Sequence, residues 1–168
     1  DELTNPDERH MMKVHLGTDH AGYEFKEVLK DHLGEEGYEV VDHGALEYDA
    51  LDDYPAFCIA AAQAVVDDRA AGLDSLGVVI GGSGNGEQMA ANLVTGARAA
   101  LAWNPEIAQL AREHNDAQIV AVGARQHSEA DAIAIVDAFL TTPFSGDERH
   151  SRRIGIMAAY ETEGQAGL

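Results

Sequence analysis

The segment LGVVIGGSGNGEQMAANL, residues 76–93, decides the fold class of this chain. Its first five residues are a short apolar run typical of a buried strand, and residues 88–93 have the composition of a helix. The glycines between them allow a sharp strand-to-helix turn, in which backbone N–H groups at the helix start point toward one spot. Such a turn can hold an anion, and Glu87 adds a carboxylate that could transfer a proton.

Three common glycine-loop motifs fail in this segment. A P-loop requires Lys at the position of Glu87. A dinucleotide-binding G-x-G-x-x-G motif is not completed from Gly82 or from Gly84, and a G-x-S-x-G nucleophile elbow has Asn85 in its last position. Taken alone, the loop is equally compatible with an anion site and with a glycine-rich turn that binds nothing.

Short apolar runs alternate with amphipathic or alanine-rich segments along the whole chain. The expected strands are 13–17, 39–42, 76–80, 97–102 and 118–122. The expected helices are 23–33, 54–66, 88–93, 105–113, 129–140 (with Ser128 as its N-cap) and 148–161. An acidic turn, 49–53, precedes the second helix. This order predicts an α/β protein with a doubly wound, five-stranded parallel sheet and a C-terminal helix.

The composition limits the domain count, the partners and the compartment. With 168 residues, the chain is expected to form one domain over 12–161, with a disordered leader or cloning remnant at 1–11 and a flexible tail at 162–168. The formal net charge of -19 argues against nucleic acid or an anionic membrane as a partner. Cys58 is the only cysteine, which excludes an intrachain disulfide and favours a cytoplasmic location.

Polar residues concentrate where the expected strands end, which is where parallel α/β sheets bind ligands. These segments are 18–20, 42–44, 81–87, 103–104 and 123–125. In the first of them, Asp19 and His20 could contact a substrate, but Asp19 alone is better explained as a helix N-cap.

Basic groups near the end of the chain offer a second cluster. His114 ends a helix, where it could shuttle a proton or complement the helix dipole, and the second role is the simpler one. Arg149 and Arg153 are four residues apart, so both could reach one phosphate, and Arg125 could join them. Pairing with surface carboxylates is the alternative. Clustering among only 11 basic residues favours the phosphate. Metal is not expected, because no CxxC, HxH or HExxH spacing occurs.

Six separated motifs, in this order, resemble the ribose-5-phosphate isomerase B family over about residues 13 to 161. They are GTDHAG (17–22), DYP (53–55), the glycine loop with AAN (81–92), REHNDA (112–117), GAR (123–125) and RHSRR (149–153).

The resemblance implies a Rossmann-like, three-layer α/β domain that interconverts ribose 5-phosphate and ribulose 5-phosphate without a metal or cofactor. It also implies a homodimer, or a tetramer, with active sites at subunit interfaces. Many family members have a catalytic Cys where this chain has Gly81. The chain instead resembles an actinobacterial-like subgroup that uses a Glu at the position of Glu87.

An enediolate isomerisation by this family assigns a role to each motif. Glu87 is the expected base, and His114 is expected to open the sugar ring with help from Asp19. Backbone N–H groups of the glycine loop are expected to stabilise the enediolate, and His20 with the arginines to hold the phosphate. The substrate-binding residues are therefore Asp19, His20, Gly82, Ser83, Gly84, Asn85, Gly86, Asn115, Arg125, Arg149 and Arg153, with Tyr54 as a further candidate.

Two alternatives remain open from the sequence. One is an isomerase of another sugar phosphate, such as allose 6-phosphate, galactose 6-phosphate or a tetrose phosphate, with a larger pocket near Tyr54 and Trp103. The other is a non-catalytic sugar-phosphate-binding module, which would have no use for the carboxylate of Glu87.

Overall fold

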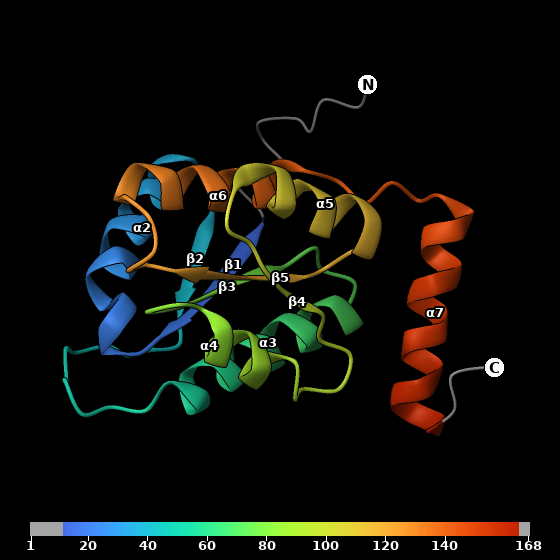
Figure 1. Ribbon diagram of the computed structural model, residues 1–168, viewed down its shortest axis with the longest axis horizontal. Coiled ribbons are helices and arrows are strands. Elements are labelled where there is room, and N and C mark those ends of the chain that lie inside the picture. The colour runs from blue at the N-terminus through green and yellow to red at the C-terminus, as the bar shows by residue number, and fades with distance from the viewer. Residues whose placement is uncertain (1–11, 165–168) are drawn as a thin grey trace.

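The computed structural model describes residues 12–164, and these form a three-layer α/β domain around a five-stranded parallel sheet (Figure 1). The strand order is β2-β1-β3-β5-β4, and every neighbouring pair is parallel. The strands are β1 (Lys13–Thr18), β2 (Glu39–Asp42), β3 (Leu76–Gly81), β4 (Ala99–Leu101) and β5 (Ile119–Gly123). The predicted fold class is confirmed.

Helices cover both faces of the sheet and divide the core in two. They are η1 (His20–Gly22), α2 (Tyr23–Glu35), α3 (Tyr54–Ala70), α4 (Asn85–Ala91), α5 (Pro105–Asn115), α6 (Glu129–Thr141) and α7 (Glu148–Glu163). Helices α2, α5 and α6 pack on one face and contribute Leu29, Ala108 and Phe139 to its core. The alanine-rich α3 and α4 pack on the other, around Ala62 and Ala91.

The position of strand β3 in the centre of the sheet explains why its sequence is continuously apolar. Both of its faces are covered, with Val78 and Ile80 in one core and Val79 in the other, and all six residues are buried. A strand buried on both faces has no solvent side and therefore no alternation.

Most predicted boundaries lie within a few residues of the observed ones, and three differ informatively. Helix α4 begins at Asn85 instead of residue 88, because Gly84, with φ of 86°, reverses the chain just before it. Strand β4 is only three residues long. Helix α7 extends to Glu163, so two residues expected in the tail are helical. The predicted leader 1–11 and residues 165–168 lie outside the described residues.

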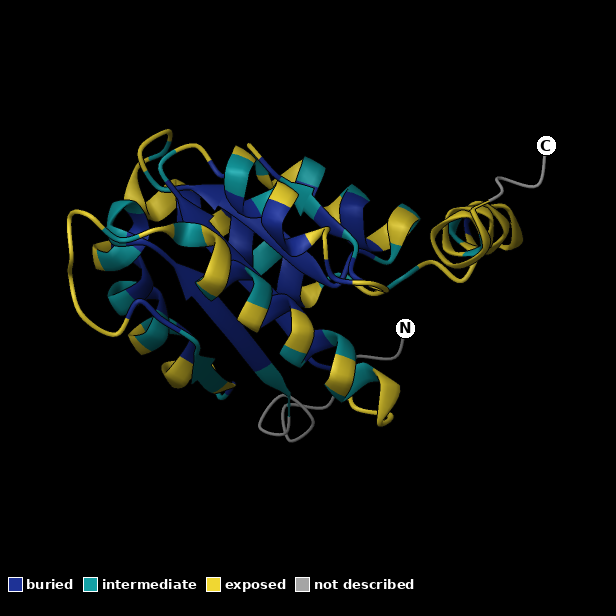
Figure 2. Ribbon diagram, turned by 90° about the horizontal axis from the view of Figure 1, so that it is seen from below, coloured by how far each residue is buried: buried dark blue, intermediate teal, exposed yellow. Residues whose placement is uncertain are grey.

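Helix α7 stands apart from the three layers (Figures 1 and 2). Its contacts with the domain include a bond of 2.7 Å from the Gly96 N–H to the Glu161 carboxylate. Only His150 of this helix is buried, and Ile156, Met157 and Tyr160 are exposed. No helix among residues 12–164 combines the length and apolar character needed to cross a bilayer.

Candidate active site

Three of the predicted site segments meet at the carboxyl end of the sheet. Thr18 pairs with Ile80, and Gly81 pairs with Gly123, so the loops that follow β1, β3 and β5 are immediate neighbours. The Ala124 N–H donates to the Gly81 carbonyl at 2.8 Å, which ties the two loops together. We call Asp19, His20, residues 81–87 and Arg125 the carboxyl-end cluster.

Close packing requires glycine at two positions of the turn, Gly84 and Gly86. A side chain on Gly84 would overlap Leu101, and one on Gly86 would overlap the hydroxyl of Tyr54. Tyr54 therefore lies directly against the turn, at the start of α3. The Ser83 hydroxyl accepts from the Asn85 N–H at 3.3 Å and helps to set the first turn of α4.

The carboxylate of Glu87 fills the space beside Gly81. A Cβ built on Gly81 would overlap both oxygens and the carboxyl carbon of Glu87, so this conformation needs glycine at position 81. Glu87 is only 4 % exposed. Burial raises the pKa of Glu87, its own backbone N–H opposes that shift, and the negative charge of Asp19 adds to it. A carboxyl group with a raised pKa is a stronger base, which suits proton abstraction from carbon.

Asp19 performs the capping role that its position predicts. It is buried, and its carboxylate accepts from the Ala21 N–H at 2.9 Å to cap η1. Because its charge also acts on Glu87 and on Cys58, it lies near the base. The thiol of Cys58 is fully buried and burial raises its pKa, so the residue belongs to the core.

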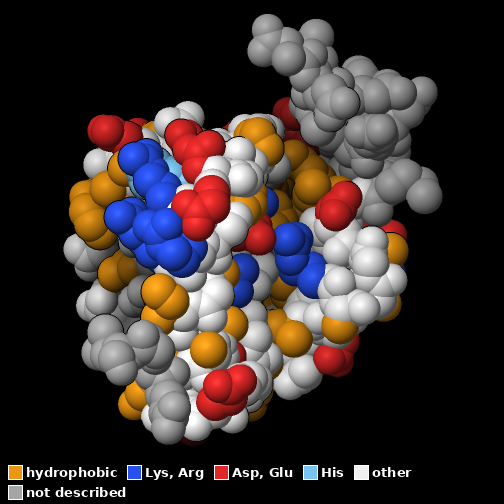
Figure 3. All heavy atoms as spheres, turned by 90° about the vertical axis from the view of Figure 1, so that its right-hand side faces the viewer, with side chains coloured by type: hydrophobic (Ala, Val, Ile, Leu, Met, Phe, Trp, Pro, Cys, Tyr) orange, Lys and Arg blue, Asp and Glu red, His pale blue; other side chains and the backbone are white. Residues whose placement is uncertain are grey.

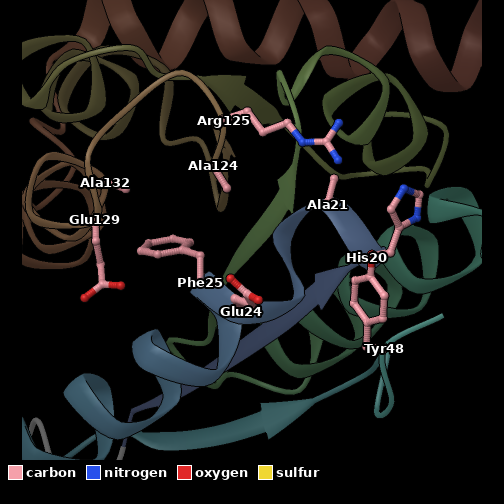
Figure 4. Close-up of a pocket in the computed structure, with 9 residues that line it drawn as sticks. All are labelled: His20, Ala21, Glu24, Phe25, Tyr48, Ala124, Arg125, Glu129 and Ala132. Carbon is pink, nitrogen blue, oxygen red and sulfur yellow. The ribbon is translucent and has the colours of Figure 1, made fainter. Parts of the chain in front are cut away.

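A cavity of about 400 Å³ opens beside the turn and joins His20 to Arg125 (Figure 4). In Figure 4 these two side chains lie on one side of the cavity and Glu129 on the other. Its lining consists of His20, Ala21, Glu24, Phe25, Tyr48, Ala124, Arg125, Glu129 and Ala132. Arg125, together with the ring of His20 when it is protonated, is suited to an anionic ligand group such as a phosphate.

The remaining predicted residues lie at the other end of the sheet. His114 and Asn115 end α5, directly before β5 begins, whereas the glycine turn lies level with the end of β5. The five residues of β5, at about 3.3 Å each, separate the two by roughly 16 Å. His114 stacks on His150 of α7, with ring centroids 4.3 Å apart. The structure therefore does not bring His114 to Glu87 within one protomer.

Arg149 and Arg153 accompany His114 at that end. Both are exposed on the first turns of α7, where Figure 3 shows Lys and Arg side chains gathered beside a histidine. The neighbouring Arg152 is bound at 2.8 Å to the carboxylate of Glu148. We call His114, Asn115, Arg149 and Arg153 the amino-end cluster.

Comparison with known proteins identifies the family of this two-part arrangement. The family model described as Ribose/Galactose Isomerase matches residues 14–157. The chain belongs to this isomerase family. Ribose-5-phosphate isomerase B of Mycolicibacterium paratuberculosis is 60 % identical over 92 % of this chain and 95 % of the relative. The enzyme of the same name from Mycobacterium tuberculosis H37Rv is 59 % identical over 92 % and 93 %.

Solved structures give the same result for the fold of this isomerase family. Ribose-5-phosphate isomerase B of Clostridium thermocellum aligns with a TM-score of 0.83 and 40 % identity, over 92 % of this chain and all of the other. The Mycoplasma genitalium structure, which has ribulose-5-phosphate bound, aligns with a TM-score of 0.84 and 38 % identity, over 90 % and 97 %. The predicted family resemblance is confirmed.

One polar residue that contacts the carboxyl-end cluster could not be recognised from the sequence. The carboxylate of Asp52, from the loop before α3, accepts both from the His20 backbone N–H at 2.9 Å and from its ring Nδ1 at 2.8 Å. In the sequence, Asp52 was only one of several acidic residues in the 49–53 turn. Asp52 is 32 residues away from His20 in the sequence, so no local sequence pattern indicates that the two side chains are in contact.

Proposed function

We propose that this protein is an aldose–ketose isomerase that interconverts ribose 5-phosphate and ribulose 5-phosphate through an enediolate, a step of the pentose phosphate pathway in the cytoplasm. The observation that carries the proposal is the buried carboxylate of Glu87 beside Gly81, at the same end of the sheet as a cavity that is lined by His20 and Arg125. The names of the close relatives support it.

The carboxyl-end cluster supplies the proton transfer. Isomerisation moves a proton between the first and second carbons of the open sugar, and Glu87 removes it from one and returns it to the other. The negative charge that develops on the enediolate oxygens needs fixed donors, and the candidates are the backbone N–H groups of Ser83, Gly84 and Gly86, since that of Asn85 donates to the Ser83 hydroxyl. His20 and Arg125 hold the phosphate at the cavity end of the substrate.

A second protomer completes the site. His114 and the two arginines lie at the end of their own sheet that is remote from Glu87. The arginines are exposed, and His114 is half-buried against His150, so another chain can reach this surface. Helix α7, which carries the arginines, stands off the domain and exposes Ile156, Met157 and Tyr160. In a two-fold dimer, or a tetramer of such dimers, each site would combine the carboxyl-end cluster of one chain with the amino-end cluster of its partner.

The reaction requires neither a metal nor a cofactor, because each step is a proton transfer. Among residues 12–164, metal-ligating atoms within 4.8 Å of one another occur on Asp19, His20 and Asp52. Two of these side chains are already bonded to each other. We expect dialysis against a chelator to leave turnover unchanged, as measured by ribulose formation. Loss of activity that Mg²⁺, Mn²⁺ or Zn²⁺ restores would assign this group a metal instead.

The direct test follows ribulose 5-phosphate formed from ribose 5-phosphate, with allose 6-phosphate, galactose 6-phosphate and erythrose 4-phosphate as competing substrates. We expect kcat/KM to be highest for ribose 5-phosphate. A higher kcat/KM for one of the other sugar phosphates would assign the protein that substrate instead. Binding without turnover of any of them would indicate a non-catalytic module and contradict the proposal.

A further inference from the structure

The side chain of Asp52 is buried directly against His20, on the edge of the proposed phosphate site. It is 10 % exposed, and one of its oxygens, Oδ1, accepts both N–H donors of His20. The second oxygen, Oδ2, is fully buried and has no hydrogen-bond partner among the described residues. A buried carboxylate with an unsatisfied oxygen is unfavourable unless a nearby positive charge compensates it.

The loop before α3 is folded to present this carboxylate. The Asp49 side chain accepts from the Leu51 N–H at 2.9 Å, and the Asp52 N–H donates to the Asp49 carbonyl at 3.1 Å. These two bonds form a tight turn that directs Asp52 inward, while Leu51 remains exposed. An aspartate that served only to keep the loop soluble would be expected to remain exposed to solvent.

The bond to Asp52 determines which nitrogen of His20 is available to a ligand. Because Nδ1 donates to the carboxylate, Nε2 is left without a protein partner in residues 12–164. The ring lines the cavity beside Arg125 (Figure 4). A doubly protonated ring held in this way offers one N–H to Asp52 and the other to an anion.

We infer that Asp52 is a positioning residue, which keeps the imidazole of His20 oriented and positively charged so that it donates to the phosphate of the substrate. The inference rests on the proposed function for the identity of the anion. The orientation and charge of the ring can be measured without any assay of turnover.

The charges around His20 support this role and define its pH dependence. The groups that act on the ring are Asp52, Asp19, Arg125 and the edge-on ring of Tyr48, and the carboxylates of Glu24 and Glu129 line the same cavity. The hydrogen bond that the His20 ring donates to Asp52 is the largest cause of the raised pKa of His20. Desolvation and the charge of Arg125 oppose this shift. Without the negative charge of Asp52, the ring would lose its proton at a lower pH.

The first test measures the pKa of His20 by NMR in Asp52→Asn and in the wild type. Asparagine keeps an acceptor for Nδ1 but removes the charge, and His20→Gln identifies the resonance among the eight histidines. We expect a lower pKa in Asp52→Asn and an unchanged one in Asp49→Asn, whose exposed side chain can keep its bond to Leu51. An unchanged pKa in folded Asp52→Asn would overturn the inference.

The second test separates positioning from a purely structural role. In Asp52→Asn we expect KM for ribose 5-phosphate to rise about tenfold relative to wild type near neutral pH, the size of one lost charge-assisted bond, with kcat little changed. The ratio of the KM of Asp52→Asn to that of the wild type should approach one in mildly acidic buffer, where the His20 ring is protonated in both proteins. In a His20→Gln background, Asp52→Asn should add nothing.

The two tests have separate modes of failure. A KM increase of equal size at every pH, or one that persists in the His20→Gln background, would mean that Asp52 only supports the loop. If the wild type does not turn over ribose 5-phosphate, the proposed function fails. The pKa comparison, with inorganic phosphate added to detect binding at His20, then decides the positioning role alone.

Discussion

The two clusters differ in how completely one chain builds them. At the carboxyl end, Glu87 is 4 % exposed, Asp19 caps the N-terminus of η1, and His20 is hydrogen-bonded to Asp52. At the amino end, the His114 side chain is 42 % exposed, and the arginines stand on a helix outside the three layers. The difference supports the proposal that one protomer alone preorganises the base and its surroundings, whereas the groups proposed for ring opening and for further phosphate contacts would become functional only against a second chain.

Replacement of Glu87 breaks the carboxyl-end cluster most directly. In Glu87→Gln, loss of the general base is expected to lower kcat by about 10³-fold, within the range for such groups, while the fold and the oligomeric state persist. The measurement is ribulose formation, with circular dichroism and light scattering on the same sample. The exposed Glu36→Gln serves as the matched control. Near-normal turnover of Glu87→Gln would remove this residue as the base.

Mixing two inactive variants tests whether the two clusters come from different chains. Glu87→Gln and His114→Ala are each expected to be nearly inactive as homodimers. After unfolding and refolding together, half of the dimers are mixed, and each mixed dimer has one intact site if the clusters pair across the interface. Activity should then return to about a quarter of the wild-type value. No recovery, with mixed dimers present by mass spectrometry, would place both clusters in the same chain.

A methyl group on Gly81 tests how finely the carboxylate is placed. Gly81→Ala puts a carbon where the carboxylate of Glu87 lies, so the base must move. We expect kcat to fall by about 10²-fold, the usual cost of a 1 Å displacement, with little loss of thermal stability. Gly34→Ala, where an added methyl meets nothing within 4 Å, controls for the substitution itself. Unchanged kcat in Gly81→Ala would mean that the observed position of Glu87 is not the catalytic one.

The smallest effects on kinetics are expected from substitution of the arginines of α7. Arg149→Ala should raise KM for ribose 5-phosphate about tenfold with little change in Tm, because a charge-assisted contact to phosphate is lost. Arg152→Ala, on the same helix but paired with Glu148, should change KM less than twofold. Equal effects of the two variants would indicate a general electrostatic contribution of the helix and remove Arg149 from the phosphate site.

Local patterns sufficed to predict the sheet, and they also supplied the residue that we propose as the base. The apolar runs marked all five strands, since each is a short apolar stretch bounded by glycines or polar turns, and β1, β3 and β5 are almost entirely buried. Glu87 was recognised because it directly follows a glycine turn. The start of α4 was missed by three residues, because the left-handed conformation of Gly84 is a property of the packed turn against Leu101.

Contacts between distant segments were beyond the reach of sequence patterns. The bond between His20 and Asp52 joins a strand end to a loop 32 residues away, and nothing local distinguishes Asp52 from the other acidic residues of its turn. Nor did the helical pattern of residues 148–161 reveal that α7 would leave the domain.

The sequence by itself therefore determined the strand–helix order, the glycine turn with its carboxylate, and the list of charged groups. Composition, periodicity and spacing are local properties, and they are sufficient for these features. Only the tertiary structure decided that Glu87 occupies the space left open by Gly81, and that His114 and the arginines lie a strand's length away from it. Those facts depend on the direction in which each parallel strand runs and on close packing between segments, which one-dimensional patterns do not record.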